Sequence, residues 1–322
     1  MKTIGVLTSG GDCPGMNACV RAIVRSAASH GMRVYGINRG YQGMLEGDIE
    51  LLDPISVSGI SGKGGTFIQT ARCVDFKTKE GRARAAEQLK KYEIEGLVVC
   101  GGDGSFSGAK LLCEEHNVPC IGIPGTIDND LAYTDFTLGF DTAVNTAINA
   151  MQNIIDTMAS HNRVCVVEVM GRGCGDIALY SAISVGADGV IIPEQPTNFE
   201  EIAARIRKTR TLGKRFNIIV LAEGCGHAAE YATKFESYLP EYSIRGTDLG
   251  HVIRGGGPSM YDRIFAGKAA IHAVELLEKG IGNRVIGIKD NKIFDMDIFE
   301  ALTMPKTGND ELYAQYNQLV LN

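Results

Sequence analysis

Several features that would place a chain in a particular class of protein are missing from this sequence. It has no CxxC pair, so the zinc-ribbon and dithiol redox classes have no support. Its longest apolar runs, such as residues 218–222, are far shorter than the roughly 20 residues that span a bilayer, and residues 1–11 do not resemble a signal peptide. Cationic residues are not in excess, since 32 Lys and Arg stand against 38 Asp and Glu. The net charge of −6 argues against binding to nucleic acid or to a membrane.

The composition that is present is that of a globular protein. Hydrophobic residues make up 44% and charged residues 22% of 322 residues, a length that suggests about two domains. The nine cysteines are scattered along the chain, and we expect reduced thiols in a cytoplasmic protein. Glycine is in excess, since its 40 residues are about 12% of the chain and roughly 7% is usual. Such an excess favours loops in which the backbone comes close to a ligand.

Short apolar runs alternate with helix-length stretches along the chain. Strands are predicted at 4–7, 34–37, 97–100, 120–123, 164–169, 190–192, 218–222 and 285–288. Helices are predicted at 16–29, 82–92, 108–116, 141–158, from 177, from 199, and at 229–238 and 260–277. This alternation predicts an α/β fold of two doubly wound, Rossmann-like domains with mainly parallel sheets. We expect a larger domain at 1–138 plus 251–305, a smaller one at 139–250, and a helical tail at 306–322.

Two glycine-rich loops follow predicted strands in the first domain. They are residues 9–12 and 101–105, and both lie where doubly wound sheets bind ligands. Glycine lets backbone N–H groups approach phosphate oxygens, and Asp103 within the second loop is a natural partner for Mg²⁺. The alternative for either loop is a sharp turn from strand to helix without a ligand.

The common nucleotide motifs do not fit. No GxxxxGK[ST] pattern occurs, and residues 59–64 lack both its spacing and its final hydroxyl. Residues 224–229 match GxGxxA after a strand, but one match in a glycine-rich chain is weak, so we interpret it as a chance match.

A third loop, residues 124–130, carries two carboxylates directly after a predicted strand. Asp128 and Asp130 would suit a base and a metal-side partner in phosphoryl transfer. The alternative is a turn rich in Asp and Asn that begins a helix.

Side chains that could hold an anionic sugar occur in other loops. Residues 170–176 predict another anion-binding loop between a strand and a helix. Glu223 could form hydrogen bonds with sugar hydroxyls. His251 lies close to an arginine and three glycines. The arginines in loops or at element ends are Arg72, Arg163, Arg172, Arg245 and Arg254. Together these features favour a kinase for a phosphorylated polyol or sugar, with the nucleotide on one domain and the acceptor on the other.

Five blocks in order resemble the ATP-dependent 6-phosphofructokinases of the bacterial type. They read GVLTSGGD at 5–12, GGDGS at 101–105, PGTIDND at 124–130, VEVMGR at 167–172 and LGHVIRGG at 249–256. The resemblance runs through nearly the whole chain. It implies transfer of the ATP γ-phosphoryl group to O1 of fructose 6-phosphate, with Mg²⁺.

The resemblance also implies roles for particular residues. Asp128 is similar in position to the family's base, with Thr126 and Asp130 beside it, and Arg72 and Arg172 would steady the transferring phosphoryl group. Asp103 would be the Mg²⁺ partner. The ATP site would comprise Gly11, Tyr41, Arg72, Cys73, Gly102, Asp103, Gly104, Ser105 and Gly108. The sugar-phosphate site would comprise Thr126, Ile127, Asp128, Arg163, Met170, Gly171, Arg172, Glu223, Arg245, His251, Val252, Ile253 and Arg254.

Two further features of the family follow from single positions. Arg163 and Arg245 match arginines that reach the 6-phosphate of a neighbouring subunit, which implies a homotetramer. Gly104 and Gly125 favour ATP, because pyrophosphate-dependent relatives typically carry Asp and Lys there. The alternatives are a pyrophosphate-dependent enzyme, an inactive ligand-binding relative, and an NAD-binding protein that rests only on residues 224–229.

The family's effector site, which binds ADP or phosphoenolpyruvate, is altered in this chain. Arg21, Arg25 and Lys214 are retained, and Asp188 stands where Glu is usual. The replaced positions are Pro54, Ile155 and Leu212 in place of cationic residues, Gly59 in place of Asp, and Phe216 in place of His. Loss of three cationic contacts predicts that regulation by these effectors is weak, absent or rebuilt.

Overall fold

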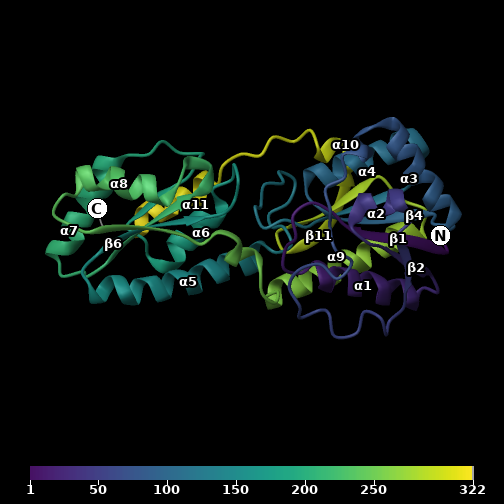
Figure 1. Cartoon of the computed structure of the whole chain (residues 1–322), viewed down its shortest axis with the longest axis horizontal. Coiled ribbons are helices and arrows are strands. Elements are labelled where there is room, and N and C mark those ends of the chain that lie inside the picture. The colour runs from purple at the N-terminus through teal and green to yellow at the C-terminus, as the bar shows by residue number, and fades with distance from the viewer. Residues whose placement is uncertain (321–322) are drawn as a thin grey trace. The chain divides into compact units, whose positions relative to one another are not determined.

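The computed structural model describes residues 1–320, which form two compact α/β units (Figure 1). Unit 1 comprises Met1–Ile127, Leu131–Asp141 and Arg254–Lys306. Unit 2 comprises Asp128–Asp130, Thr142–Ile253 and the chain from Thr307 onward. The predicted fold class, two Rossmann-like domains with mainly parallel sheets, is confirmed. Which ligand each unit binds stays a prediction.

Unit 1 is built on a seven-stranded sheet in the order β11-β10-β5-β4-β1-β2-β3. Only the edge strands β3 and β11 run antiparallel to their neighbours. Neither edge strand was identifiable from an apolar run, because both are only partly buried and carry charged residues. The strands are β1 (Thr3–Thr8), β2 (Arg33–Ile37), β3 (Ile49–Leu52), β4 (Gly96–Gly101), β5 (Cys120–Pro124), β10 (Arg284–Lys289) and β11 (Lys292–Asp297).

Helices cover both faces of this sheet. Helices α1 (Met16–Ser29) and α9 (Met260–Glu278) pack against each other on one face, as Figure 1 shows. The other face is covered by α2 (Gly40–Glu46), α3 (Lys79–Lys91), α4 (Asp103–His116) and α10 (Ile298–Ala301), with a 3₁₀ turn, η1, at Asp75–Lys77. The predicted start of α4 at residue 108 is wrong. The helix begins at Asp103, so the glycine-rich residues 103–105 form its first turn.

Unit 2 is built on a four-stranded parallel sheet in the order β7-β8-β6-β9. Its strands are β6 (Val164–Val169), β7 (Gly189–Ile191), β8 (Asn217–Ala222) and β9 (Ile244–Asp248). Side chains of β6 alternate between faces, so Val164 and Val166 join the core under α7 and α8. Its helices are α5 (Phe140–Ser160), α6 (Asp176–Val185), α7 (Phe199–Thr211), α8 (Ala228–Tyr238) and α11 (Asp310–Leu319). It also contains the 3₁₀ turns η2 (Glu223–Cys225) and η3 (Gly250–Arg254). The first two residues of α5 and the last residue of η3 belong to unit 1.

The C-terminal helix α11 clusters with unit 2. It packs on α6, and the Tyr316 hydroxyl donates a hydrogen bond to the Ala187 carbonyl at 3.3 Å. Burial raises the pKa of Tyr316. No helix within residues 1–320 is both long and apolar enough to cross a membrane.

Strand register decides which loops emerge together. In unit 1, Thr8 is paired with Cys100, and Cys100 with Ile123, so β1, β4 and β5 end at one edge of the sheet. The strand order reverses direction at β1 and β4, and such a switch point is where open α/β sheets bind ligands. In unit 2, Val169 is paired with Ala222, so the loops after β6 and β8 also emerge side by side.

Candidate active site

The loop after β1 carries Gly11, which lies under an arginine side chain. A Cβ added to Gly11 would lie 2.2 Å from Nη2 of Arg254, so a side chain at position 11 would displace this guanidinium. The same guanidinium pairs with Asp12 at 3.2 Å and also donates to the Asp12 carbonyl. Arg254 was predicted as a sugar-phosphate contact. In unit 1 its side chain contacts the loop after β1, which was predicted to bind the nucleotide.

The second glycine-rich segment is the N-terminal turn of α4. Gly102 precedes the helix, Asp103 is exposed in its first turn, and Ser105 is buried. A Cβ added to Gly104 would meet nothing within 4 Å, so open space adjoins this turn. The N-terminus of a 14-residue helix carries partial positive charge, which suits a phosphate group.

Tyr41 packs directly against this helix. Its hydroxyl donates to the Ser105 carbonyl at 2.6 Å, and its ring stacks on Phe76 with centroids 4.0 Å apart. Burial raises the pKa of Tyr41. A Cβ on Gly108 would lie 3.0 Å from the Tyr41 ring, so tight packing favours glycine there.

The remaining predicted nucleotide residues lie in the loop before η1. Arg72 is exposed and Cys73 is half-buried, and burial raises the pKa of the Cys73 thiol. All nine cysteines are free thiols. Within residues 1–320, no group of three or more His, Cys, Asp or Glu side chains could hold a metal ion by itself.

The loop after β5 is tightly fixed at its start. The Gly125 N–H donates to the Gly101 carbonyl at 2.9 Å, and a Cβ on Gly125 would lie 2.9 Å from the Cys100 sulfur. The Thr137 hydroxyl donates to the Thr126 carbonyl at 2.6 Å, and Ile127 is buried. These hydrogen bonds fix the start of the loop within unit 1. The next three residues, 128–130, belong to unit 2.

In unit 2 the structure brings Asp128 and Arg172 together. Nε of Arg172 lies 3.4 Å from Oδ2 of Asp128, whose side chain is only 9% exposed while that of Arg172 is 73% exposed. Arg172 has a left-handed backbone with φ 52°, and Gly171 has φ 142°. Both of their N–H groups donate to Oε1 of Glu223, at 2.8 and 3.1 Å respectively.

These contacts correct the prediction of a backbone anion site at residues 170–176. The N–H groups of Gly171 and Arg172 already donate to Glu223, and that of Gly175 donates to Oε1 of Glu194 at 2.8 Å. An anion at this loop can therefore be held by the Arg172 side chain but not by these N–H groups. Glu194 was missed in the sequence because a lone carboxylate after an edge strand gives no pattern.

The GxGxxA match at residues 224–229 is likewise not an open anion site. The N–H of Ala228, the first residue of α8, donates to Oε2 of the buried Glu168 at 2.7 Å. Nδ1 of His227 lies 3.3 Å from the other Glu168 oxygen, and this hydrogen bond raises the pKa of His227. A carboxylate thus occupies the place where a pyrophosphate would bind in a dinucleotide fold.

Met170 and residues 251–253 also belong to the predicted sugar-phosphate set. The Leu249 N–H donates to the Glu168 carbonyl at 3.1 Å, which fixes the start of η3 beside β6. His251 and Val252 are exposed and Ile253 is buried. Met170 and Asp130 are half-buried.

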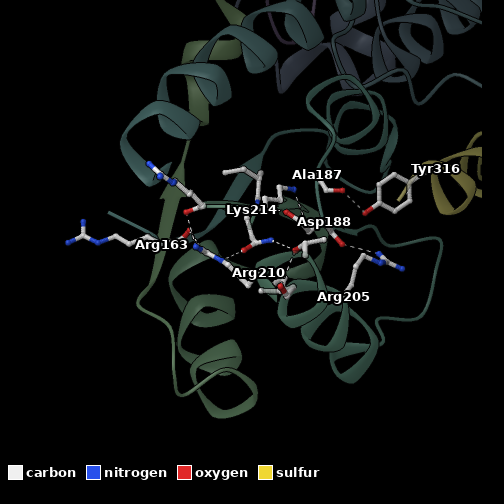
Figure 2. Close-up of polar contacts among 12 residues, drawn as sticks. Arg163, Ala187, Asp188, Arg205, Arg210, Lys214 and Tyr316 are labelled. Carbon is white, nitrogen blue, oxygen red and sulfur yellow. Dashed lines mark hydrogen bonds and ion pairs between the residues drawn. The ribbon is translucent and has the colours of Figure 1, made fainter. Parts of the chain in front are cut away.

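Arg163 and Arg245 lie at the opposite edge of the unit 2 sheet. Arg163 directly precedes β6, and Arg245 is paired with Cys165 near the start of β9. Figure 2 shows the Arg163 side chain extending away from Asp188 and Arg210. Six residues of β6 separate Arg163 from Met170, a distance of roughly 20 Å at about 3.3 Å per residue. One phosphate cannot contact both ends of the same strand.

The predicted effector residues fall in both units. Arg21 and Arg25 lie on α1 in unit 1. In unit 2, Nζ of Lys214 lies 2.8 Å from Oδ1 of Asp188 (Figure 2). It also lies 5.0 Å from the centre of the Phe216 ring. Oδ2 of Asp188 accepts the Ile218 N–H at 3.1 Å. The retained lysine is therefore neutralised by a carboxylate that is itself buried.

A small cavity of about 110 Å³ adjoins this ion pair. Arg205 lines it and donates to the Asp188 carbonyl at 2.9 Å, while α11 contributes Tyr316 and Leu319. A drug-sized ligand occupies a cleft of about 300–1,000 Å³, so within unit 2 this cavity is too small for a nucleotide.

Comparisons of this chain with known proteins all point to one family. Residues 3–277 match the family described as Phosphofructokinase. The ATP-dependent 6-phosphofructokinase of Clostridioides difficile (strain 630) is 54% identical over 97% of this chain and 98% of its own length. The ATP-dependent 6-phosphofructokinase 1 of Clostridium perfringens (strain 13 / Type A) is 51% identical over 99% of both chains. The phosphofructokinase structure from Saccharomyces cerevisiae superposes with a TM-score of 0.88 at 34% identity, over 98% of this chain and 50% of the yeast chain. The chain belongs to the phosphofructokinase family.

Proposed function

We propose that the protein transfers the γ-phosphoryl group of ATP to O1 of D-fructose 6-phosphate, giving fructose 1,6-bisphosphate and ADP. Unit 1 would bind ATP and unit 2 the sugar phosphate. The observation that carries the proposal is the buried Asp128 carboxylate beside the Arg172 guanidinium, in a chain whose curated relatives are named ATP-dependent 6-phosphofructokinases.

The chemistry assigned to Asp128 is proton removal. Its carboxylate accepts the proton of the O1 hydroxyl while O1 forms a bond to the γ-phosphorus and the bond from that phosphorus to the ADP oxygen breaks. The exposed Arg172 guanidinium, at 3.4 Å from Asp128, can follow the charge that develops on the transferring group. Arg72, also exposed, is proposed to act in the same way from unit 1, and Thr126 and Asp130 to assist beside the base.

Mg²⁺ fits the residues present, with Asp103 as its protein partner. Magnesium keeps several waters and is usually held by one or two carboxylates together with substrate phosphates, so a three-residue cluster is not needed. Asp103 lies in the exposed first turn of α4, next to the open space at Gly104. When bound, Mg²⁺ neutralises charge on the phosphate oxygens.

The open space at Gly104 also supports ATP as the donor. A side chain at position 104 would extend into the space beside the helix N-terminus, where the α-phosphate is proposed to lie. An aspartate there would repel that phosphate, whereas glycine leaves room.

We infer that the active form is an oligomer, in this family a tetramer. Arg163 and Arg245 lie at the amino edge of the unit 2 sheet, while Arg172 and Glu223 follow the carboxyl ends of its strands. These arginines can therefore act on a sugar phosphate only if it is bound to another subunit. A mixture of the inactive variants Arg163→Ala and Asp128→Ser, dissociated and reassembled together, should regain activity. Absence of any regain would refute the shared site.

The test of the reaction compares two phosphoryl donors. Initial rates of fructose 1,6-bisphosphate formation are measured with Mg²⁺ and either ATP or pyrophosphate, for the wild type and Asp128→Ser. We expect turnover with ATP alone, and a fall of about 10²–10⁴-fold in the variant, the usual contribution of a general base. The thermal unfolding midpoint of the variant controls for folding.

Other outcomes would overturn separate parts of the proposal. Turnover with pyrophosphate would show that the argument from Gly104 is wrong. Turnover by Asp128→Ser at the wild-type rate would remove Asp128 as the base. No product with either donor would favour a protein that binds these ligands without reaction.

A further inference from the structure

A buried hydrogen bond holds the residue that follows Asp128. Nδ2 of Asn129 donates to Oδ2 of Asp176 at 2.8 Å, and the two residues are 2% and 4% exposed. Asp176 is the first residue of α6, and like residues 128–130 it belongs to unit 2. A hydrogen bond to a carboxylate in a buried place is among the stronger ones in proteins.

This bond acts on a strained backbone. Asn129 has φ 52°, in the left-handed region that costs most side chains about 1 kcal/mol or more and that asparagine tolerates best. The Cys174 thiol also lies 3.8 Å from the Asn129 carbonyl oxygen. Residues 174–176 therefore contact both the side chain and the carbonyl group of Asn129. The backbone torsions of Asn129 set the direction in which the chain leaves Asp128.

The partner of Asp128 is held in a similar way. Arg172 also has φ 52°, and its N–H and that of Gly171 donate to Glu223. Each member of the Asp128–Arg172 pair is therefore at or next to a left-handed residue that a neighbouring carboxylate fixes. Strain of this kind persists only where the surroundings determine it, and it gathers at functional sites.

We propose that Asp176 is a positioning residue for the phosphoryl transfer. It acts through Asn129, whose conformation it fixes, and so aims the Asp128 carboxylate at the hydroxyl it deprotonates. The inference rests on the proposed function of Asp128.

The test uses a pair whose donor and acceptor can be exchanged. In Asn129→Asp two carboxylates face each other, and in Asp176→Ala the acceptor is lost. We expect kcat to fall about 30–100-fold in each, because a displacement of about 1 Å can cost 10²-fold in rate. The KM for ATP should stay within twofold, since the change lies in unit 2. The double variant Asn129→Asp/Asp176→Asn restores an amide–carboxylate pair in reverse, and its kcat should recover to within about fivefold of the wild type.

Glu200→Ala is the matched control, because Glu200 is an exposed acid in the first turn of α7 and tests whether loss of a first-turn carboxylate matters by itself. Its kcat should not change. A kcat of Asp176→Ala within twofold of wild type, or a double variant no better than Asn129→Asp, would overturn the inference. A wild type without turnover would instead overturn the proposed function.

Discussion

The Arg172 guanidinium and the Asp128 carboxylate form an ion pair in which the carboxylate is buried and the guanidinium is exposed. Nε lies 3.4 Å from Oδ2, with Asp128 9% and Arg172 73% exposed. A buried carboxylate gains from a cation nearby, and an exposed arginine keeps the freedom to rotate toward a ligand. The pair thus joins a fixed group to an adjustable one, which suits a base and a charge-stabilising residue.

Arg172→Ala should lower kcat by about 10²–10³-fold, the usual cost of removing one group that stabilises transition-state charge. Arg172→Lys keeps the charge but not the planar fork, and should regain only part of the loss. Steady-state kinetics with varied fructose 6-phosphate would measure both. If Arg172→Ala raised only the KM for the sugar phosphate and left kcat unchanged, Arg172 would be a binding residue and not part of the chemistry.

Two glycines proposed to select the donor should respond differently to substitution. Gly104→Asp enters open space, so we expect normal folding and a KM for ATP raised by about tenfold or more through repulsion of the phosphate. Gly125→Lys would press its Cβ against the Cys100 sulfur at 2.9 Å and the Met16 methyl at 3.2 Å. That crowding should destabilise the protein by about 1–3 kcal/mol.

Thermal unfolding and ATP kinetics of the two single variants separate these effects. A Gly104→Asp protein with unchanged KM for ATP would contradict the role of open space in donor choice. A Gly125→Lys protein as stable as the wild type would show that the loop after β5 can shift.

The sequence predicted those parts of the fold that are buried on both faces. The runs at 164–169 and 218–222 correspond to β6 and β8, because such strands are apolar throughout. Strands β3, β9 and β11 were missed, since partial exposure allows charged residues in them. The start of α4 was missed because glycines at positions 102 and 104 have poor helix propensity, which the tertiary fold overrides.

The structure brings together Asp128 and Arg172, whose roles stay predictions, and these candidate residues were predicted because a motif carries them. The supporting contacts were not, because Glu168, Asp176 and Glu194 reach loops distant in sequence. For the same reason the sequence treated residues 170–176 as an open anion loop. Only the structure shows that Glu223 and Glu194 already accept hydrogen bonds from three of its N–H groups.

The rate curve for fructose 6-phosphate should be insensitive to ADP and phosphoenolpyruvate. Lys214 is neutralised by Asp188 at 2.8 Å, and Leu212, which stands where a cation is usual, is 69% exposed. An anionic effector would therefore lack most of its contacts. Titration of each effector should shift the half-saturation point by less than twofold. A sigmoidal curve relieved by micromolar ADP would contradict this prediction.

Outside the site, the stability of unit 1 should depend on the charge of Asp295. Its carboxylate accepts hydrogen bonds from His272 at 2.8 Å and from Arg284 at 2.5 Å. Burial raises the pKa of Asp295, but these hydrogen bonds outweigh burial and hold its pKa below the usual value. Because the folded pKa is lowered, the stabilisation is fully present above about pH 4, near the unfolded pKa, and is lost as pH falls through the folded value.

Asp295→Asn should therefore cost about 1–3 kcal/mol at pH 7, the usual worth of hydrogen bonds to a charged group. The difference in thermal unfolding midpoint between wild type and variant should be present at pH 5 and should narrow below about pH 4. Both proteins are measured in the same buffers, so titrating groups that do not contact residue 295 cancel in the comparison. Because an asparagine has the same shape but no charge, a difference that persisted undiminished at the lowest pH would show that packing around residue 295, and not its ionisation, holds β11 against α9.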